Sequence, residues 1–97
     1  MRDAVIVAAA RPPIGRAYRG AYNATPAPTL GSLAIRAAVE RAGIEGGEVD
    51  DVIWGSALQQ GGQSPNIARL AALRAGLPVT VPAMSIDRQC ASGLMAI

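Results

Sequence analysis

The residue best suited to chemistry in this chain is its single cysteine, Cys90. The largely apolar residues 82–87 precede it and predict a strand, and the small residues that follow predict a helix beginning at Cys90. At a helix N-terminus, free backbone N–H groups and the positive end of the dipole favour a thiolate and a developing oxyanion. The segment is therefore typical of a nucleophile site.

A lone cysteine also has a structural interpretation, because a free cysteine usually packs as a small apolar residue. In favour of a nucleophile, Ala91, Ser92 and Gly93 are all small, so a substrate can approach the sulfur closely. The strand-to-helix turn follows the logic of a hydrolase nucleophile elbow, although the G-x-S-x-G pattern is absent. Spacing alone leaves both interpretations open.

The chain contains no histidine, the base that most often activates a cysteine nucleophile. Asp87 and Ser92 are close in sequence, but an ionised Asp87 disfavours a neighbouring thiolate. Either Cys90 is inert, or its base lies outside these 97 residues.

Three apolar runs, at residues 3–10, 52–58 and 82–87, predict strands. The first is continuously apolar, as expected of a strand buried on both faces. Helical segments between the runs imply right-handed parallel crossovers, and therefore an α/β fold with a mostly parallel sheet flanked by helices. Reactive groups in such sheets gather at the carboxyl ends of strands, where Cys90 falls.

Two intervening segments carry helix boundaries. The first helix is expected to run from Thr29 as N-cap to Gly43 as its stop, and the second from Ser64 as N-cap to Gly76. The glycine- and glutamine-rich residues 59–65 lack both the P-loop lysine and the G-x-G-x-x-G spacing. They favour a structural loop over a phosphate site.

The composition indicates which partners and which cell compartment are favoured. The net charge is +2, all nine basic residues are arginine, and Arg11, Arg16 and Arg19 share one segment with little aromatic interleaving, which argues against nucleic acid. One cysteine cannot form an intramolecular disulfide, and no signal peptide or membrane-length apolar stretch is visible. We expect a cytoplasmic protein with no membrane partner, no metal and no bound cofactor.

Residues 91–97 predict only the first two turns of a helix, with no C-cap, and a helix of that length is marginal by itself. We therefore expect residues 1–97 to be an incomplete N-terminal domain of a larger protein. The alternative is a small protein whose last helix frays.

Three segments of the chain resemble the thiolase family, in the family's order and spacing. Residues 86–97 are similar to its acylation-site motif, in which the reactive cysteine is followed by a small residue, Ser and Gly. Residues 10–15 resemble its Ala-Arg-Thr-Pro-Ile/Phe-Gly, and residues 61–78 resemble the segment before the cysteine. Pro12 stands where Thr is usual, and Asp87 where Asn, Ser or Thr is usual, which adds a carboxylate near the thiol if it points inward.

The resemblance implies the first quarter of a thiolase, ending at the start of its catalytic helix. It implies acyl transfer through a thioester on Cys90, whose backbone N–H contributes to an oxyanion hole. The full-length enzyme would cleave 3-oxoacyl-CoA to acetyl-CoA and a shortened acyl-CoA, or catalyse the reverse Claisen condensation, with coenzyme A as substrate. The family's His base, second Cys and most CoA contacts come later in the chain, so residues 1–97 alone are expected to be inactive.

The resemblance also implies a homodimer or homotetramer and a place in fatty acid metabolism. Two alternatives remain open. One is a ketoacyl-synthase-like condensing enzyme that uses carrier-protein thioesters. The other is a non-catalytic thiolase-like module that serves as a partner or lipid-binding scaffold.

Overall fold

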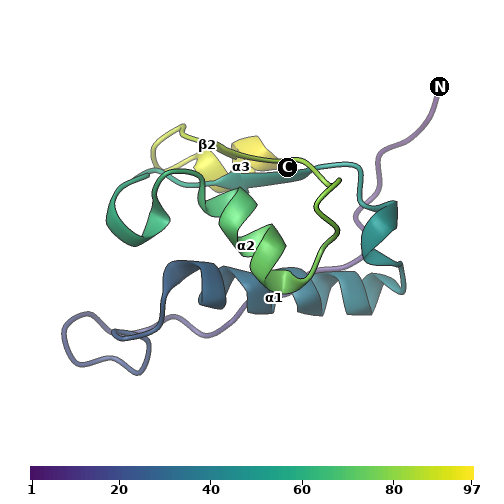
Figure 1. Ribbon diagram of the computed structural model, residues 1–97. Helices are drawn as coiled ribbons and strands as arrows, with labels where there is room; N and C mark the ends of the chain where they lie inside the picture. The colour runs from purple at the N-terminus through teal and green to yellow at the C-terminus, as the bar shows by residue number, and fades with distance from the viewer.

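The computed structural model describes residues 1–97, the whole of the sequence, and has an α/β architecture (Figure 1). Its elements in chain order are helix α1 (Ala27–Ala42), the 3-10 helix η1 (Gly46–Glu48), strand β1 (Val52–Gly55), the 3-10 helix η2 (Gly61–Gln63), helix α2 (Ile67–Ala75), strand β2 (Ala83–Ile86) and helix α3 (Ser92–Ala96). Strands β1 and β2 pair in parallel. The predicted α/β class with a parallel sheet is confirmed.

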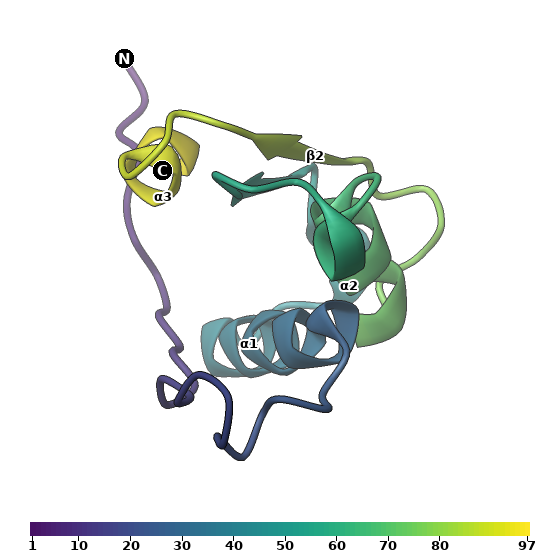
Figure 2. The ribbon, with the colours of Figure 1, turned by 90° about the vertical axis from the view of Figure 1, so that its left-hand side faces the viewer.

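Helices α1 and α2 lie on the same side of the two strands, with α2 between the strands and α1 (Figures 1 and 2). Small residues let these layers approach closely. A Cβ at Gly31 of α1 would lie 3.0 Å from the Ala71 Cβ of α2 and 3.2 Å from the Trp54 ring of β1. The buried apolar side chains belong mainly to α2 and the loop after it, and they are Ile67, Ala68, Ala71, Ala72, Leu77 and Val81.

The ends of the two long helices agree with prediction, whereas their beginnings differ. Gly43 and Gly76 end α1 and α2 in the left-handed region, with φ of 68° and 89°. Thr29 lies inside α1 rather than capping it, because a proline in the first turn needs no acceptor for an N–H. Ser64 is not the cap of α2 either: the Asn66 side chain accepts the hydrogen bond of the first turn, at 3.3 Å.

Residues 3–10 do not form the strand that their apolar character predicts. Val5, Ile6 and Val7 are 71–80% exposed, and no backbone N–H of the segment donates a hydrogen bond. The Arg41 guanidinium holds the segment by donating to the Ala9 carbonyl at 2.6 Å.

This N-terminal segment runs past α3 and α1 and does not pair with β1 (Figure 2). A hollow of about 660 Å³ is lined by Ala8 and Ala10 together with residues of α1, β1 and α3. The sheet therefore has two strands instead of three, because an apolar run becomes a strand only where a partner edge lies within hydrogen-bond reach.

Candidate active site

Cys90 lies in the turn that joins β2 to α3 (yellow in Figure 1). Ala91 is the N-cap of α3 and Ser92 its first residue, so the helix starts later than predicted and Cys90 precedes the cap. The reason is that residues 88–92 form a turn with hydrogen bonds of its own. Because α3 has only five residues, the surroundings of the thiol are those of the turn and not those of a long helix.

The thiol of Cys90 is exposed. Within these 97 residues, Cys90 is therefore not a core side chain. Ala91 and Gly93 beside it are exposed as well, so no bulky neighbour covers the sulfur. This exposure meets the first requirement for a reactive cysteine, which is access.

The Asp87 carboxylate belongs to the same turn. It is exposed, and one of its oxygens accepts a hydrogen bond from the backbone N–H of Gln89 at 2.8 Å. The other oxygen accepts from the Gln89 side-chain amide at 3.5 Å. This carboxylate therefore acts as the acceptor of an Asx turn, a local role that shapes the chain before the cysteine.

The backbone N–H of Cys90 stands out among the amides of the turn. The Gln89 N–H donates to Asp87, and the Ala91 N–H donates to the Arg88 carbonyl at 3.0 Å. The Cys90 N–H between them donates to no group of the chain. An amide with no internal acceptor next to an exposed thiol can donate to the oxyanion that forms when the sulfur attacks a carbonyl carbon.

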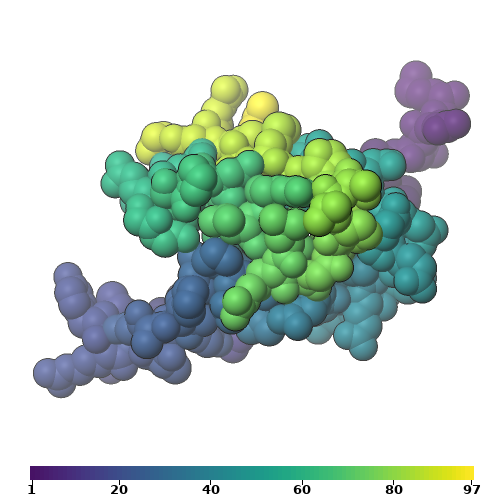
Figure 3. Space-filling view, viewed as in Figure 1, coloured from purple at the N-terminus to yellow at the C-terminus, as the bar shows by residue number.

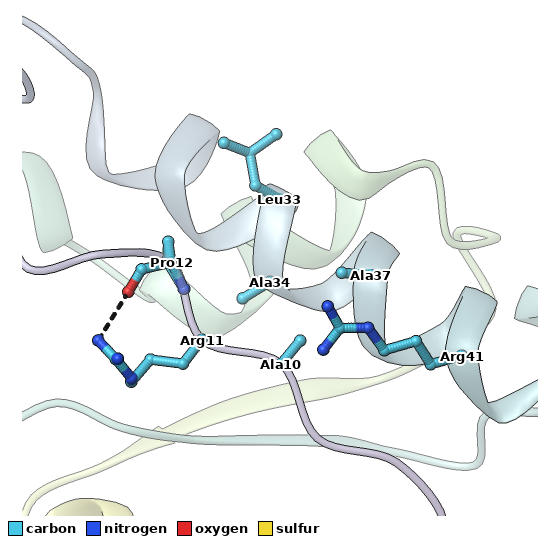
Figure 4. A pocket seen from close by; sticks show the side chains of 7 residues that line it. All are labelled: Ala10, Arg11, Pro12, Leu33, Ala34, Ala37 and Arg41. Carbon is cyan, nitrogen blue, oxygen red and sulfur yellow. Dashed lines mark hydrogen bonds between the residues drawn. The ribbon is translucent and has the colours of Figure 1, made fainter.

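These residues do not build a binding cavity around the thiol. Cys90 lines none of the four hollows of the chain. One of them, of about 170 Å³, lies between residues 10–12 and α1, where Arg11 donates to the Pro12 carbonyl at 3.3 Å (Figure 4). It is remote from the turn in sequence and is lined by no residue of it.

The loop before α2 has an internal structural explanation. The Ser56 hydroxyl donates to the Gln63 side-chain oxygen at 2.7 Å, and the Gln59 side chain donates to the Ser56 carbonyl at 3.3 Å. Polar groups of the loop are thus used to hold η2 against the end of β1. The observation supports the prediction of a structural loop.

Sequence reasoning did not single out Gly55, the last residue of β1, as a neighbour of the site. A Cβ on Gly55 would lie 2.5 Å from the backbone nitrogen of Gly93 and overlap the backbone of Ser92. A glycine at the end of a strand is a signal for close backbone approach, and it could have pointed to this contact.

The fold and the site define a class: a parallel α/β protein with an exposed cysteine in the turn after the carboxyl end of a strand. The chain belongs to the thiolase family, and its residues 4–97 match the family's N-terminal domain. The resemblance seen in its three sequence segments is thereby confirmed.

Similar proteins carry two related names. The chain is 49% identical to an acetyl-CoA acetyltransferase of Pseudomonas aeruginosa and 50% identical to one of Cupriavidus necator, each over 98 residues that cover 100% of this chain and 24% of the relative. It is 41% identical to a 3-ketoacyl-CoA thiolase of Bacillus subtilis, of which it covers 25%. The chain thus spans about a quarter of the length of these relatives.

Proposed function

We propose that the whole protein carrying this domain is an acyl-CoA acyltransferase. It cleaves a 3-oxoacyl-CoA with coenzyme A into acetyl-CoA and a shortened acyl-CoA, or catalyses the reverse Claisen condensation. Cys90 carries the acyl group as a thioester. The supporting observation is an exposed thiol beside its own unbonded N–H, in a chain about half identical to acetyl-CoA acetyltransferases.

In the first step, a base removes the Cys90 proton and the sulfur attacks the keto carbon of the substrate. A carbon–sulfur bond forms and the keto oxygen becomes an oxyanion, to which the Cys90 N–H donates. The bond between the keto carbon and the α-carbon then breaks. The carbonyl re-forms as the thioester, and the departing acetyl-CoA carbanion takes up a proton.

In the second step, the deprotonated thiol of coenzyme A attacks the thioester carbon. The same N–H donates to the second oxyanion, the carbon–sulfur bond to Cys90 breaks, and the shortened acyl-CoA leaves. The Cys90 thiolate is regenerated, so the cysteine acts as a covalent catalyst that splits one hard step into two easier ones.

The chain supplies only part of this machinery. It has no histidine and no second cysteine, so the base and the proton donor lie outside these 97 residues. Because Cys90 lines no hollow, most contacts to coenzyme A also lie elsewhere in the whole protein. In the proposal, this domain contributes the nucleophile and one oxyanion donor. Coenzyme A is a substrate, and the reaction requires neither a metal nor a bound cofactor.

Two observations favour this function over the alternatives. The names of the relatives refer to CoA thioesters, which supports CoA substrates over carrier-protein thioesters. A non-catalytic module has no need of an exposed thiol beside an unbonded N–H.

Intact-mass measurement of the full-length protein after incubation with acetoacetyl-CoA tests the proposal. We expect one acetyl adduct that peptide mapping places on Cys90, and no adduct on the Cys90→Ala variant. A full-length protein that stays unmodified contradicts the proposal and favours the non-catalytic module. Modification by an acyl carrier-protein thioester alone would favour the condensing enzyme.

The compartment, the oligomeric state and the metabolic role of the whole enzyme are also proposals. We propose a cytoplasmic protein, which the single unpaired cysteine of this chain and the bacterial relatives support. A homodimer or homotetramer and a role in fatty acid metabolism are proposed from membership of the thiolase family. Some relatives are mitochondrial, among them the acetyl-CoA acetyltransferase of Xenopus tropicalis. None of the helices combines the length and apolar character that a membrane crossing requires.

A further inference from the structure

The hydroxyl of Ser92 closes the turn that contains Cys90. Its oxygen accepts a hydrogen bond from the Arg88 N–H at 2.9 Å, and its O–H donates one to the Gln89 carbonyl at 2.6 Å. The side chain is only 4% exposed. One buried hydroxyl therefore fixes two backbone groups that immediately precede the cysteine, and a buried polar group left without its partner is costly.

The bond to Gln89 bears directly on Cys90. The Gln89 carbonyl and the Cys90 N–H belong to one planar peptide group and point in opposite directions. The carbonyl accepts both from the Ser92 hydroxyl and from the Ser92 N–H, the latter at 3.1 Å. Because rotation of this peptide group would break both bonds, Ser92 sets the direction of the Cys90 N–H.

The conformation of Gln89 shows why such bonds are needed. Its φ is 50°, in the left-handed region that residues other than glycine rarely adopt. A backbone held there persists only when its surroundings determine it. Two hydrogen bonds hold the Gln89 backbone in this conformation. The Asp87 carboxylate accepts from the Gln89 N–H, and the Ser92 hydroxyl donates to the Gln89 carbonyl.

Gly55 is the contact point of β1 for the other side of the turn. It is the last residue of β1 and pairs with Ile86, the last residue of β2. The backbone of Ser92 and Gly93 lies so close to Gly55 that a Cβ there would be 2.5 Å from the Gly93 nitrogen. Real Cβ atoms essentially never come within 3.0 Å of a backbone atom, so any side chain at residue 55 displaces the start of α3.

We propose that Ser92 and Gly55 are positioning residues for Cys90: the Ser92 hydroxyl aims the Cys90 N–H at the oxyanion, and Gly55 sets the depth at which the turn rests on the sheet. The inference rests on the proposed function, because it concerns the same oxyanion donor. Neither residue touches the substrate in this scheme. Their contribution is the orientation of a donor, and misplacement of a catalytic group by about 1 Å can cost about 100-fold in rate.

The test measures acylation of Cys90 by acetoacetyl-CoA in the full-length protein, in single-turnover and steady-state assays. Ser92→Ala should lower the acylation rate and kcat by about 10- to 100-fold, with KM changed by less than about threefold, because the N–H acts on the oxyanion and not on the bound substrate. Ser92→Thr, which keeps the hydroxyl, should recover most of the rate. Alkylation of Cys90 by iodoacetamide forms no oxyanion and should change by less than about threefold.

The matched control is Ser32→Ala. Ser32 is also buried, and its hydroxyl donates to the Thr29 carbonyl at 2.7 Å, but it lies in α1. This variant should acylate within about twofold of the wild type, since it leaves the turn intact. To test the contact between Gly55 and the turn, Gly55→Ala should lower the acylation rate at least as much as Ser92→Ala. Gly47→Ala, whose Cβ would meet only the Pro78 ring at 4.0 Å, should not.

The outcomes separate this inference from the proposed function. If the wild-type protein forms no adduct, the proposed function fails. If the wild-type protein acylates and folded Ser92→Ala acylates at the same rate, the positioning role of Ser92 is wrong. If Ser92→Ala and Ser32→Ala lose equal amounts of acylation rate, or if the alkylation rate of Ser92→Ala falls in parallel, Ser92 only stabilises the fold. If Ser92→Ala fails to fold, as judged by circular dichroism, the comparison of Gly55→Ala with Gly47→Ala tests whether the position of the turn controls acylation. Equal acylation rates in these two variants would contradict the proposal.

Discussion

The side chain of Asn66, just before α2, joins that helix to β2. Its oxygen accepts hydrogen bonds from the Arg69 N–H at 3.3 Å and the Ser85 hydroxyl at 2.8 Å, and its amide group donates to the Ala83 carbonyl at 3.1 Å. It therefore caps α2 and ties that helix to β2, the strand that leads into the Cys90 turn.

Replacing this side chain should destabilise the protein. Asn66→Ala removes the cap and leaves the Ala83 carbonyl without this donor, and we expect a loss of about 1–3 kcal/mol in the free energy of unfolding. Asn66→Asp keeps the capping oxygen and should lose less. Urea unfolding followed by circular dichroism measures both. Asn23→Ala, at an exposed loop position, should stay within about 0.5 kcal/mol of the wild type.

At the scale of elements, the approach of α1 to the rest of the domain depends on the absence of a side chain at Gly31. This residue is buried in α1 and faces both Ala71 of α2 and Trp54 of β1. Two helices and a strand thus meet at one glycine. Helix, strand and helix form a single packed unit because small residues stand where they cross.

A larger residue at this crossing should separate the layers. Gly31→Val adds a branched side chain where even a Cβ would be 3.0 Å from Ala71, and we expect a loss of about 1–3 kcal/mol through overpacking. Calorimetric unfolding measures the loss. The control is Gly47→Val, because a Cβ at Gly47 would meet only the Pro78 ring, at 4.0 Å. If Gly31→Val is as stable as this control, the close contact does not limit the approach of α1.

Across the whole molecule, little of the chain is buried. Only 10 of the 97 residues are buried, and the apolar residues 5–7 and Leu94 are largely exposed. In the proposed function, an exposed cysteine that lines none of the hollows, in a chain without histidine, is a partial site. Its chemistry depends on groups from outside these residues.

We expect the isolated 97-residue chain to neither cleave nor condense acyl-CoA, because it has no histidine base, no second cysteine and no hollow that Cys90 lines. A coupled assay for acetyl-CoA release with acetoacetyl-CoA and coenzyme A measures this. The full-length protein at the same concentration serves as the positive control. Sustained turnover by the purified 97-residue chain would mean that the proposed division of the site is wrong.

Local signals were sufficient for several parts of the fold. Gly43 and Gly76 end their helices because a left-handed residue after the last turn is a local requirement that glycine meets at little cost. The runs that contain β1 and β2 could likewise be found from their apolar residues, as could the place of Cys90 after a strand. Figure 1 adds the layering, in which α2 and α1 stack on one side of the two strands. The space-filling view shows the same order, from yellow through green to blue (Figure 3).

The remaining features depend on what lies near each residue in space. Residues 3–10 carry the apolar pattern of a strand but no partner edge reaches them, and Asn66 caps α2 instead of Ser64 because its side chain also reaches β2. The sequence alone determined the cysteine, its small neighbours and the family. The tertiary structure decided that the thiol is exposed, that its N–H has no internal acceptor and that Gly55 seats the turn, because exposure, pairing and close approach are properties of groups brought together from different elements.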